Sequence, residues 1–471
     1  MFELHHLTAL EQLDWLRRGE VTPVELATHY LERIERLNDG LGAFTTVTAD
    51  AAIARAADVE ASVPKAATLW GLPIGDKDLV ARAGVRTTFG SRLFESFVPE
   101  ESDELVDVVD AAGAVSLGKT NAPEFGMPAY TESLVAGPAR NPHAPQLGAG
   151  GSSGGAAVAV AAGLLPVAPG SDGGGSVRIP AAATGLVGLK PSRGRVPSGS
   201  GFTSVGGLVA TGPLARTVAD AALLLDALVT DDPYPWSVGA PTWNGGAFLN
   251  AAVRGEGTYS IGVMTTSPWD DWTDILISPE ASSALSVAVT ELGAAGHGIE
   301  EFSLDPAPGY AAAFRVIWQA GAATIPADGA DLDRLEPLTR WLVERGRALG
   351  ARELATALQD LAVFERSVIH QFSRFDVVLT PALALPPRSI GWFDPADGER
   401  NFEQQVQYTP WTSFVNVSGL PAITLPVAVT DAGLPMGAQL IGRPGREDVL
   451  LSIGAQLERR LGWQRRHPPQ W

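Results

Sequence analysis

Residues 148–196 read GAGGSSGGAAVAVAAGLLPVAPGSDGGGSVRIPAAATGLVGLKPSRGRV, and the interpretation of the whole chain starts from this stretch. Two glycine–serine clusters, Gly150–Gly155 and Gly173–Ser176, flank an alanine-rich apolar segment. Ser152 and Ser176 are 24 positions apart, which is enough for a helix and a turn that bring the clusters together. Because glycine costs conformational entropy on folding, such clusters mark places where the backbone approaches another group closely.

The composition is that of a folded protein with an acidic surface. The chain has 471 residues, 45% hydrophobic and 18% charged, which argues against long disordered regions. A net charge of −19 argues against a nucleic-acid partner, because phosphates repel an acidic surface. The absence of cysteine excludes disulfides and a thiolate nucleophile. No signal peptide is recognisable, and the apolar run Ala156–Ala168 is too short to span a bilayer, so we expect a cytoplasmic protein with no membrane partner.

Helix and strand signals alternate along the chain, which favours one large α/β domain. The expected strands include Ala114–Leu117, Tyr259–Val263 and the segment DVVLTPAL at 376–383. We expect a surface loop at Thr230–Pro241 and little regular structure over Asp305–Leu349. The expected helices are Ala9–Arg18, Pro23–Leu37, Asp50–Glu60, Ser102–Ala112, Thr217–Val229, Pro279–Ala295, Ala351–Phe372 and Glu447–Leu461.

Two common kinds of site find no support in the sequence. Gly113–Thr120 (GAVSLGKT) matches the phosphate-binding pattern GxxxxGK[ST], but a helix is expected before it and a buried strand within it. In a true phosphate-binding loop that segment is the loop itself, so we predict no nucleotide site. None of the seven histidines lies in a GxSxG motif, and no HExxH spacing occurs, which argues against a Ser–His–Asp triad and a metal site.

A nucleophilic serine in this chain therefore needs another proton acceptor, and a lysine, a carboxylate or a metal-bound group stays open. Lys77 lies among apolar residues in GLPIGDKDLV, where burial can lower the pKa of a lysine by up to ~3–5 units. An ion pair with Asp76 or Asp78 on a loop is the alternative. Lysine is rare in this chain, with only Lys65, Lys77, Lys119 and Lys190 among 34 basic residues.

The second glycine cluster has the composition of an oxyanion hole. Three glycines directly before Ser176 would present consecutive backbone N–H groups around its hydroxyl, and side chains there would obstruct them. Asp172 and Arg178 flank the cluster and are expected to pair and hold the loop. Taken separately, each glycine cluster is also compatible with a hinge or a tight loop.

Together these motifs resemble the amidase signature family. The resemblance rests on Lys77 in GDKD, GKTNAPEF at Gly118–Phe125, GGSSGG and SDGGGSVRIPAAATGLVGLKPSRGRV. Thr131, Ser133, RNP at Arg140–Pro142 and two C-terminal motifs, PWTSFVNVSGLPAITLP and GLPMGAQLIGRPG, extend it over essentially the whole chain. The motif GSDGGGSxRIPA is most similar to that of the bacterial branch that contains cyclic nylon-oligomer (6-aminohexanoate cyclic dimer) hydrolases.

The resemblance implies a central mixed β-sheet covered by helices on both faces, and a Ser–cis-Ser–Lys triad. Ser176 corresponds to the nucleophile, Ser152 to the bridging serine that follows a cis peptide bond, and Lys77 to the general base. The backbone N–H groups of Gly173, Gly174, Gly175 and Ser176 correspond to the oxyanion hole. Supporting roles are expected for Ser153, Asp172, Arg178 and Asn121. Substrate contacts are expected from Met127, Thr131, Gly150, Gly151 and Trp318.

The implied reaction is hydrolysis of the C–N bond of a small linear or cyclic amide through an acyl-enzyme, without a cofactor or metal. Hydrolysis of esters, carbamates or hydrazides stays open, as does a glutamine-hydrolysing subunit of a tRNA-dependent amidotransferase. The expected partner is a small-molecule amide, and a homodimer is left open. Within the single domain, 1–471, we distinguish an N-terminal helical segment (1–65), the catalytic core (66–230), a variable substrate-side region (231–350) and a C-terminal part (351–471).

Two departures from the family pattern bear on which acyl group fits. Gly173 stands where many relatives carry Thr or Ile, and Ala136-Gly137 replaces the usual phenylalanine-glycine. In the variable region, Trp318 and Trp341 either cover an apolar acyl group or belong to the core.

Overall fold

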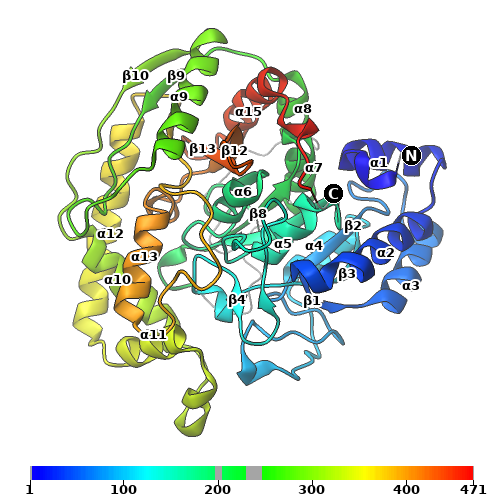
Figure 1. Ribbon diagram of the computed structural model, residues 1–471, viewed down its shortest axis with the longest axis horizontal. Coiled ribbons are helices and arrows are strands. Elements are labelled where there is room, and N and C mark those ends of the chain that lie inside the picture. The colour runs from blue at the N-terminus through cyan, green and yellow to red at the C-terminus, as the bar shows by residue number, and fades with distance from the viewer. Residues whose placement is uncertain (1–2, 197–203, 230–246, 470) are drawn as a thin grey trace.

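The computed structural model of the chain describes residues 3–196, 204–229, 247–469 and 471 (Figure 1). The predicted loop at Thr230–Pro241 lies outside these residues. No helix in the described ranges is long and apolar enough to cross a membrane.

A mixed sheet forms the centre of the protein, as predicted, and it has eight strands. Their order is β10-β9-β11-β13-β12-β7-β8-β6. β9 pairs in parallel with β10 and β11, and the other neighbouring strands are antiparallel. The strands are β6 (Val167–Asp172), β7 (Val187–Lys190), β8 (Ala210–Ala215), β9 (Ser260–Val263), β10 (Gly298–Glu301), β11 (Val377–Pro381), β12 (Ala422–Val429) and β13 (Pro435–Gly442).

A second, three-stranded sheet adjoins the edge of the large one. Its order is β1-β3-β2, with β2 parallel to β3, and β2 lies beside the edge strand β6. This arrangement brings the end of β2, at Lys77, next to the end of β6. The strands are β1 (Phe44–Val47), β2 (Pro73–Lys77) and β3 (Val115–Thr120), and a small hairpin pairs β4 (Glu132–Ser133) with β5 (Gly137–Pro138).

Helices cover both faces of the large sheet. α5 (Gly154–Ala161) and α6 (Arg178–Thr184) pack together on one face. α5 has the sequence GGAAVAVA and is buried throughout, because its small side chains allow close approach to the strands. The opposite face carries α7 (Val218–Leu228), α8 (Ala247–Arg254), α9 (Pro279–Ala294) and α15 (Glu447–Leu461).

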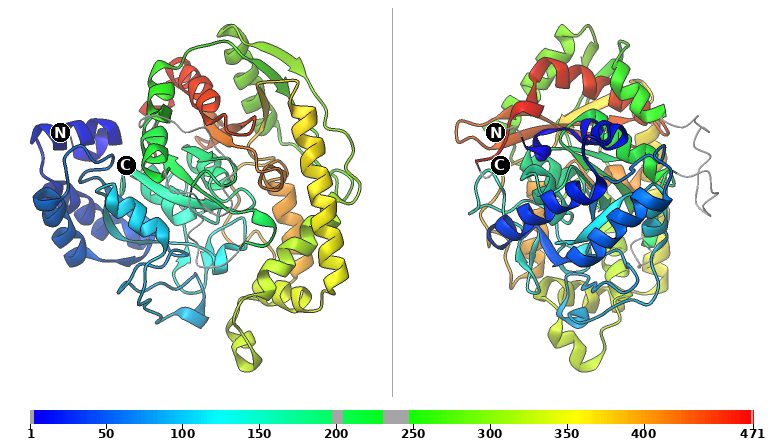
Figure 2. Two further views of the ribbon diagram at one scale, coloured as in Figure 1. Left: turned by 180° about the vertical axis from the view of Figure 1, so that it is seen from behind. Right: turned by 90° about the vertical axis from the view of Figure 1, so that its right-hand side faces the viewer.

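The remaining helices gather at the two ends of the molecule (Figures 1 and 2). At the end near both chain termini lie α1 (Ala9–Arg18), α2 (Pro23–Leu41), α3 (Ala49–Ser62) and α4 (Glu104–Ala111). At the other end lie α10 (Tyr310–Ala323), α11 (Pro337–Arg347), α12 (Ala351–Phe372), α13 (Gly398–Tyr408) and α14 (Ser413–Val417). Short 3₁₀ helices occur at Leu4–His6, Arg92–Phe94, Glu124–Gly126, Val205–Gly207, Gly329–Arg334 and Trp463–Arg465.

The prediction of little regular structure over Asp305–Leu349 is wrong, because α10 and α11 occupy most of it. α10 has six alanines among its 14 residues, and Tyr310, Phe314 and Ile317 recur at helical spacing and are buried against neighbouring helices. The prediction missed this helix signal. The rejection of a phosphate-binding loop is confirmed. Residues 115–120 form the buried strand β3, and Lys119 is buried, with its amine donating to the Val80 carbonyl and the Thr87 hydroxyl.

Candidate active site

Lys77 is buried at the end of β2, with 1% of its surface exposed. Its Nζ donates to Ser152 Oγ at 2.8 Å, to Ser171 Oγ at 2.9 Å and to the Ser171 carbonyl at 3.3 Å. Burial lowers the pKa of Lys77 from 10.5 to about 7, and the negative charge of Asp172 opposes this shift only in part. A large fraction of Lys77 is therefore neutral near pH 7, which a general base requires.

The alternative of an ion pair between Lys77 and a neighbouring aspartate is wrong. Asp76 lies 2.6 Å from Arg82 Nε, and Asp78 lies 3.8 Å from Lys119 Nζ. Both carboxylates thus have other cationic partners.

Sequence reasoning missed Ser171. Both its hydroxyl and its carbonyl accept hydrogen bonds from Lys77, so it orients the amine. Ser171 belongs to the same SDGGGS motif as Ser176, but no local pattern marks which residue of β6 lies beside the end of β2.

Ser152 lies in the turn that leads into α5. The Gly151–Ser152 peptide bond is cis, as the family resemblance implies. A Cβ at position 151 would lie 2.6 Å from the Tyr130 carbonyl carbon, so only glycine fits there. The next residue, Ser153, connects the two glycine clusters: its N–H donates to the Ser176 carbonyl at 3.1 Å and its hydroxyl to the Ser171 carbonyl at 3.2 Å.

Asp172 holds the loop that carries Ser176. Its carboxylate accepts from the N–H groups of Gly175 at 2.8 Å and Val177 at 3.1 Å. Arg178 donates to the same carboxylate from Nε at 3.0 Å and from Nη2 at 2.8 Å. Burial alone would raise the pKa of Asp172, but the adjacent Arg178 outweighs it and holds the pKa well below its usual range. The predicted pairing of Asp172 with Arg178 is therefore present in the structure.

Arg178 also connects this loop to the last quarter of the chain. Its guanidinium donates to Gln439 Oε1 in β13 at 2.7 Å and to Asn416 Oδ1 in α14 at 2.6 Å. Asn416 in turn donates to Asp172 Oδ1 at 2.9 Å. These side chains are all buried, so the network is shielded from water.

The backbone of the Gly173–Ser176 loop supplies fewer free donors than predicted. The Gly175 N–H is directed at Asp172, whereas those of Gly173, Gly174 and Ser176 have no acceptor among the described residues. Gly175 has φ 130°, and a Cβ there would lie 2.5 Å from Thr412 Oγ1, so glycine is required. A Cβ on Gly173 would lie 3.3 Å from Val209 Cγ2, which is a tight contact, but with a side chain and not with the backbone.

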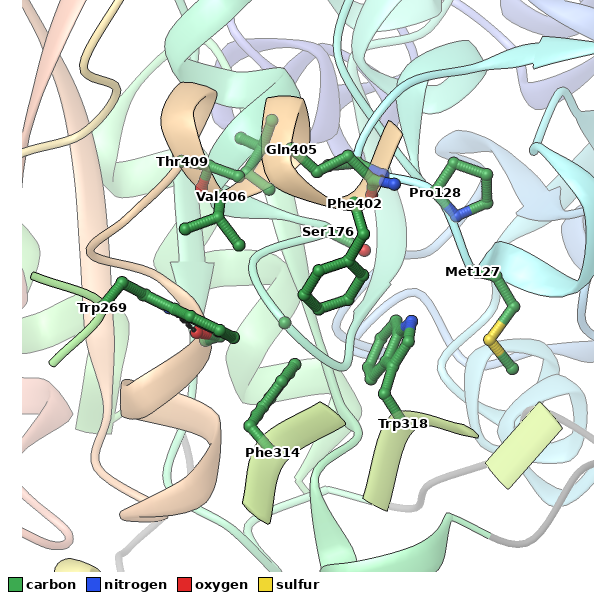
Figure 3. A pocket seen from close by; sticks show the side chains of 14 residues that line it. Met127, Pro128, Ser176, Trp269, Phe314, Trp318, Phe402, Gln405, Val406 and Thr409 are labelled. Atoms are coloured by element: carbon green, nitrogen blue, oxygen red, sulfur yellow. Dashed lines mark hydrogen bonds between the residues drawn. The ribbon is translucent and has the colours of Figure 1, made fainter. Parts of the chain in front are cut away.

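Two cavities meet at Ser176. The larger, of about 790 Å³, is bordered by Ser152, Ser171 and mainly aliphatic side chains. The smaller, of about 460 Å³, is bordered by aromatic side chains (Figure 3). Met127, Ser176 and Trp318 border both. No charged side chain occurs among the described residues that line either cavity.

The residues predicted to contact substrate divide into two groups. Met127 and Trp318 line the cavities. Thr131, Gly150 and Gly151 line neither: the Thr131 hydroxyl donates to the Gly150 carbonyl at 3.0 Å and supports the first glycine cluster.

Two further predicted residues lie away from the cavities. Asn121 has a supporting position, since its amide donates to the carbonyls of Gly42 at 3.0 Å and Gly137 at 3.1 Å. Trp341 lines neither cavity and lies against Gly398.

Among the described ranges, one group of side chains has the spacing of a metal site, and it borders neither cavity. The ligand atoms of Glu3, His5 and His29 lie within 4.8 Å of one another. Arg33 Nη1 is 3.8 Å from the Glu3 carboxylate, and this fixed positive charge opposes binding of a cation.

Comparison with known proteins agrees with this geometry. The chain belongs to the amidase family, whose model matches residues 25–451, and is a hydrolase of carbon–nitrogen bonds. It is 38% identical over 463 residues to the putative amidase AmiB2 of Mycobacterium tuberculosis, spanning 98% of this chain and 97% of that protein. It is 33% identical to one of the subunits of the glutamyl-tRNA(Gln) amidotransferase of Azotobacter vinelandii, spanning 99% of each.

The solved structures similar to this chain include 6-aminohexanoate cyclic dimer hydrolase complexed with substrate. That structure superposes with a TM-score of 0.91 at 29% identity, covering 99% of this chain and 100% of the other. The fold is therefore that of the amidase signature enzymes.

Proposed function

We propose that this protein hydrolyses a small uncharged amide through a covalent acyl-enzyme on Ser176. The observation that carries the proposal is the buried Lys77 amine, whose pKa of about 7 and 2.8 Å contact with Ser152 suit a general base. Ser152 and Ser176 border the same cavity, and the N–H of the next residue, Ser153, donates to the Ser176 carbonyl at 3.1 Å, so the two loops that carry these serines lie side by side. The relay uses only groups of the chain and needs no cofactor.

In the proposed acylation, neutral Lys77 takes a proton from Ser152, which takes one from Ser176 as its oxygen attacks the carbonyl carbon. The free N–H groups of Gly173, Gly174 and Ser176 stabilise the resulting oxyanion, and one such donor is typically worth ~3–4 kcal/mol. The proton then returns through Ser152 to the leaving nitrogen, and the C–N bond breaks. Water releases the acyl group by the same relay in reverse.

The lining of the cavities argues against free glutamine as the substrate. Glutamine carries a carboxylate and an ammonium group, and burying either without a charged partner is costly. No charged residue lines the described part of either cavity. Glutamine hydrolysis is retained as a second candidate only because the whole length of the chain resembles one component of a glutamyl-tRNA(Gln) amidotransferase. Esters and carbamates of similar polarity are compatible with the same acyl-enzyme.

The test combines labelling with two variants. A fluorophosphonate should add mass at Ser176 alone, and Ser176→Ala should abolish both labelling and amide hydrolysis. Lys77→Ala should abolish hydrolysis at neutral pH, whereas Lys65→Ala, at an exposed lysine, should keep the wild-type rate. Labelling of another serine, or full activity in Lys77→Ala, would exclude the proposed relay. A clear preference for glutamine over neutral amides would favour the second candidate.

A further inference from the structure

The two cavities differ in how they relate to the proposed proton relay. Ser152 and Ser171 border the larger cavity and not the smaller. The smaller cavity is instead bordered by Gly174 and Ile179. Ser176 thus lies at the boundary, with the relay on one side only.

This asymmetry orients a bound amide, provided that the proposed function holds. The attacked carbon carries four groups: the Ser176 oxygen, the oxyanion facing the free N–H groups, the leaving nitrogen and the acyl substituent. The nitrogen must receive its proton from Ser152, so it lies on the side of the larger cavity. The acyl substituent is left with the smaller cavity. We infer that the smaller cavity is the acyl site and selects an apolar, ring-sized acyl group, while the larger cavity takes a neutral amine.

The walls of the smaller cavity are aromatic. Phe314 and Trp318 extend from α10, and Phe402 extends from α13 (Figure 3). Phe314 stacks on Trp318 with ring centroids 5.5 Å apart, and Trp269 meets Phe314 edge-to-face at 5.5 Å. Such surfaces favour hydrocarbon and aromatic groups through burial and ring contacts.

Two polar side chains of this cavity, Gln405 and Ser413, already make hydrogen bonds within the protein. Gln405 Oε1 accepts from the Ala129 N–H at 2.8 Å, and its amide donates to Asn401 at 2.7 Å. Ser413 Oγ accepts from Trp269 Nε1 at 3.0 Å. An acyl group with a charged end would therefore lose its hydration without gaining a counter-charge.

The larger cavity suits an uncharged amine. Leu79, Leu208, Ile317 and Ile325 contribute aliphatic surface, and no carboxylate lines the described part of the cavity. A leaving group that carries another, protonated amine would be buried without a counter-charge.

Two filling substitutions test the assignment, one for each cavity. Val406→Phe adds a ring to the smaller cavity from α13. Gly321→Leu adds a side chain to the larger cavity from α10, where a Cβ meets nothing within 4 Å. Neither position belongs to the relay.

Each variant is assayed with two substrate series. One series keeps the aniline leaving group and enlarges the acyl group from acetyl to butyryl to benzoyl. The other keeps the acetyl group and enlarges the amine. Relative to wild type, Val406→Phe should lower kcat/KM for the benzoyl member at least ~10-fold more than for the acetyl member, and spare the amine series. Gly321→Leu should lower kcat/KM for the largest amine at least ~10-fold more than for the smallest, and spare the acyl series. The opposite pattern, or equal losses in both series, would overturn the assignment.

A measurement on the wild-type protein does not depend on either variant folding. The Ser176 oxygen donates an electron pair to the boron of an alkylboronic acid and its proton passes to the Ser152–Lys77 relay, so the boron substituent occupies the acyl site. Butylboronic acid should inhibit at least ~10-fold more tightly than methylboronic acid, and phenylboronic acid more tightly than its 4-carboxy derivative. Equal affinities within either pair would overturn the inference. If no amide is hydrolysed and Ser176 is not labelled by fluorophosphonate, the proposed function itself fails.

Discussion

Removing the hydroxyl of Ser171 should shift the pH dependence of hydrolysis toward acid. In the wild-type protein kcat/KM should rise with pH around 7, because Lys77 must lose its proton to act as the base. Ser171 Oγ accepts a hydrogen bond from the Lys77 amine at 2.9 Å, and this bond is stronger when the lysine is charged. Ser171→Ala therefore destabilises the protonated lysine more than the neutral one.

The size of the shift follows from the two hydrogen-bond strengths. A bond from a charged donor contributes ~1.5–3 kcal/mol and one from a neutral donor ~0.5–1.5 kcal/mol, a difference of ~1 kcal/mol. At 1.36 kcal/mol per pH unit, the midpoint of the rise moves down by ~0.7 unit. The ratio of variant to wild-type kcat/KM should then be roughly threefold higher at pH 6 than at pH 8.

The assay measures kcat/KM for a neutral amide from pH 5.5 to 8.5 at constant ionic strength. Ser153→Ala is the matched control, because its hydroxyl contacts the Ser171 backbone but not Lys77. The control should keep the wild-type midpoint. A midpoint that stays in place or moves upward in Ser171→Ala would refute the role of this hydroxyl, and a wild-type profile without a rise near pH 7 would refute that of Lys77.

Three further predictions concern stability and the nucleophile loop. Burying protonated Lys77 lowers the free energy of unfolding, fully below pH 7 and progressively less as the pH rises toward 10.5. Lys77→Met should therefore raise Tm most near pH 6 and less and less toward pH 10. Asp172→Asn should lower the free energy of unfolding by ~3–5 kcal/mol in denaturant titrations, because it leaves the buried Arg178 guanidinium without a counter-charge. Asp14→Asn, which removes an exposed ion pair, should cost under ~1 kcal/mol. Gly175→Ala should lower both Tm and kcat clearly more than Gly173→Ala, because the closest contact of a Cβ at 173 is the Val209 side chain, at 3.3 Å. Equal effects would contradict the loop geometry.

The sequence predicted the parts of the site that local patterns encode. Glycine is needed at positions 151 and 175 because a Cβ would meet backbone or a packed side chain within 2.6 Å, and this requirement appears in the sequence as two clusters. Lys77 was recognisable because apolar neighbours and a strand signal predict burial. Most helix bounds followed from periodicity, whereas the mixed sheet was implied by the family resemblance.

The remaining features depend on contacts between distant segments. Ser171 meets Lys77 only because β6 and β2 lie side by side, a neighbour relation that neither strand encodes. The Gly175 N–H donates to the Asp172 carboxylate, because the loop folds around that group, and so it is not free to donate to an oxyanion. The smaller cavity is lined by side chains from α10 and α13, and neither helix encodes that it lies beside the other.

The bonds from Arg178 to Gln439 and Asn416 have a consequence for biosynthesis. Gln439 follows Arg178 by 261 residues, and at roughly 5–20 residues per second a ribosome needs about 13–52 s to make that interval. Until then the loop carrying Ser176 lacks two of its buried partners. The nascent chain can bury Lys77 and form β6 early, yet it should remain unreactive toward fluorophosphonate until its final quarter has emerged. Stalled chains ending before and after β13 should therefore differ sharply in labelling.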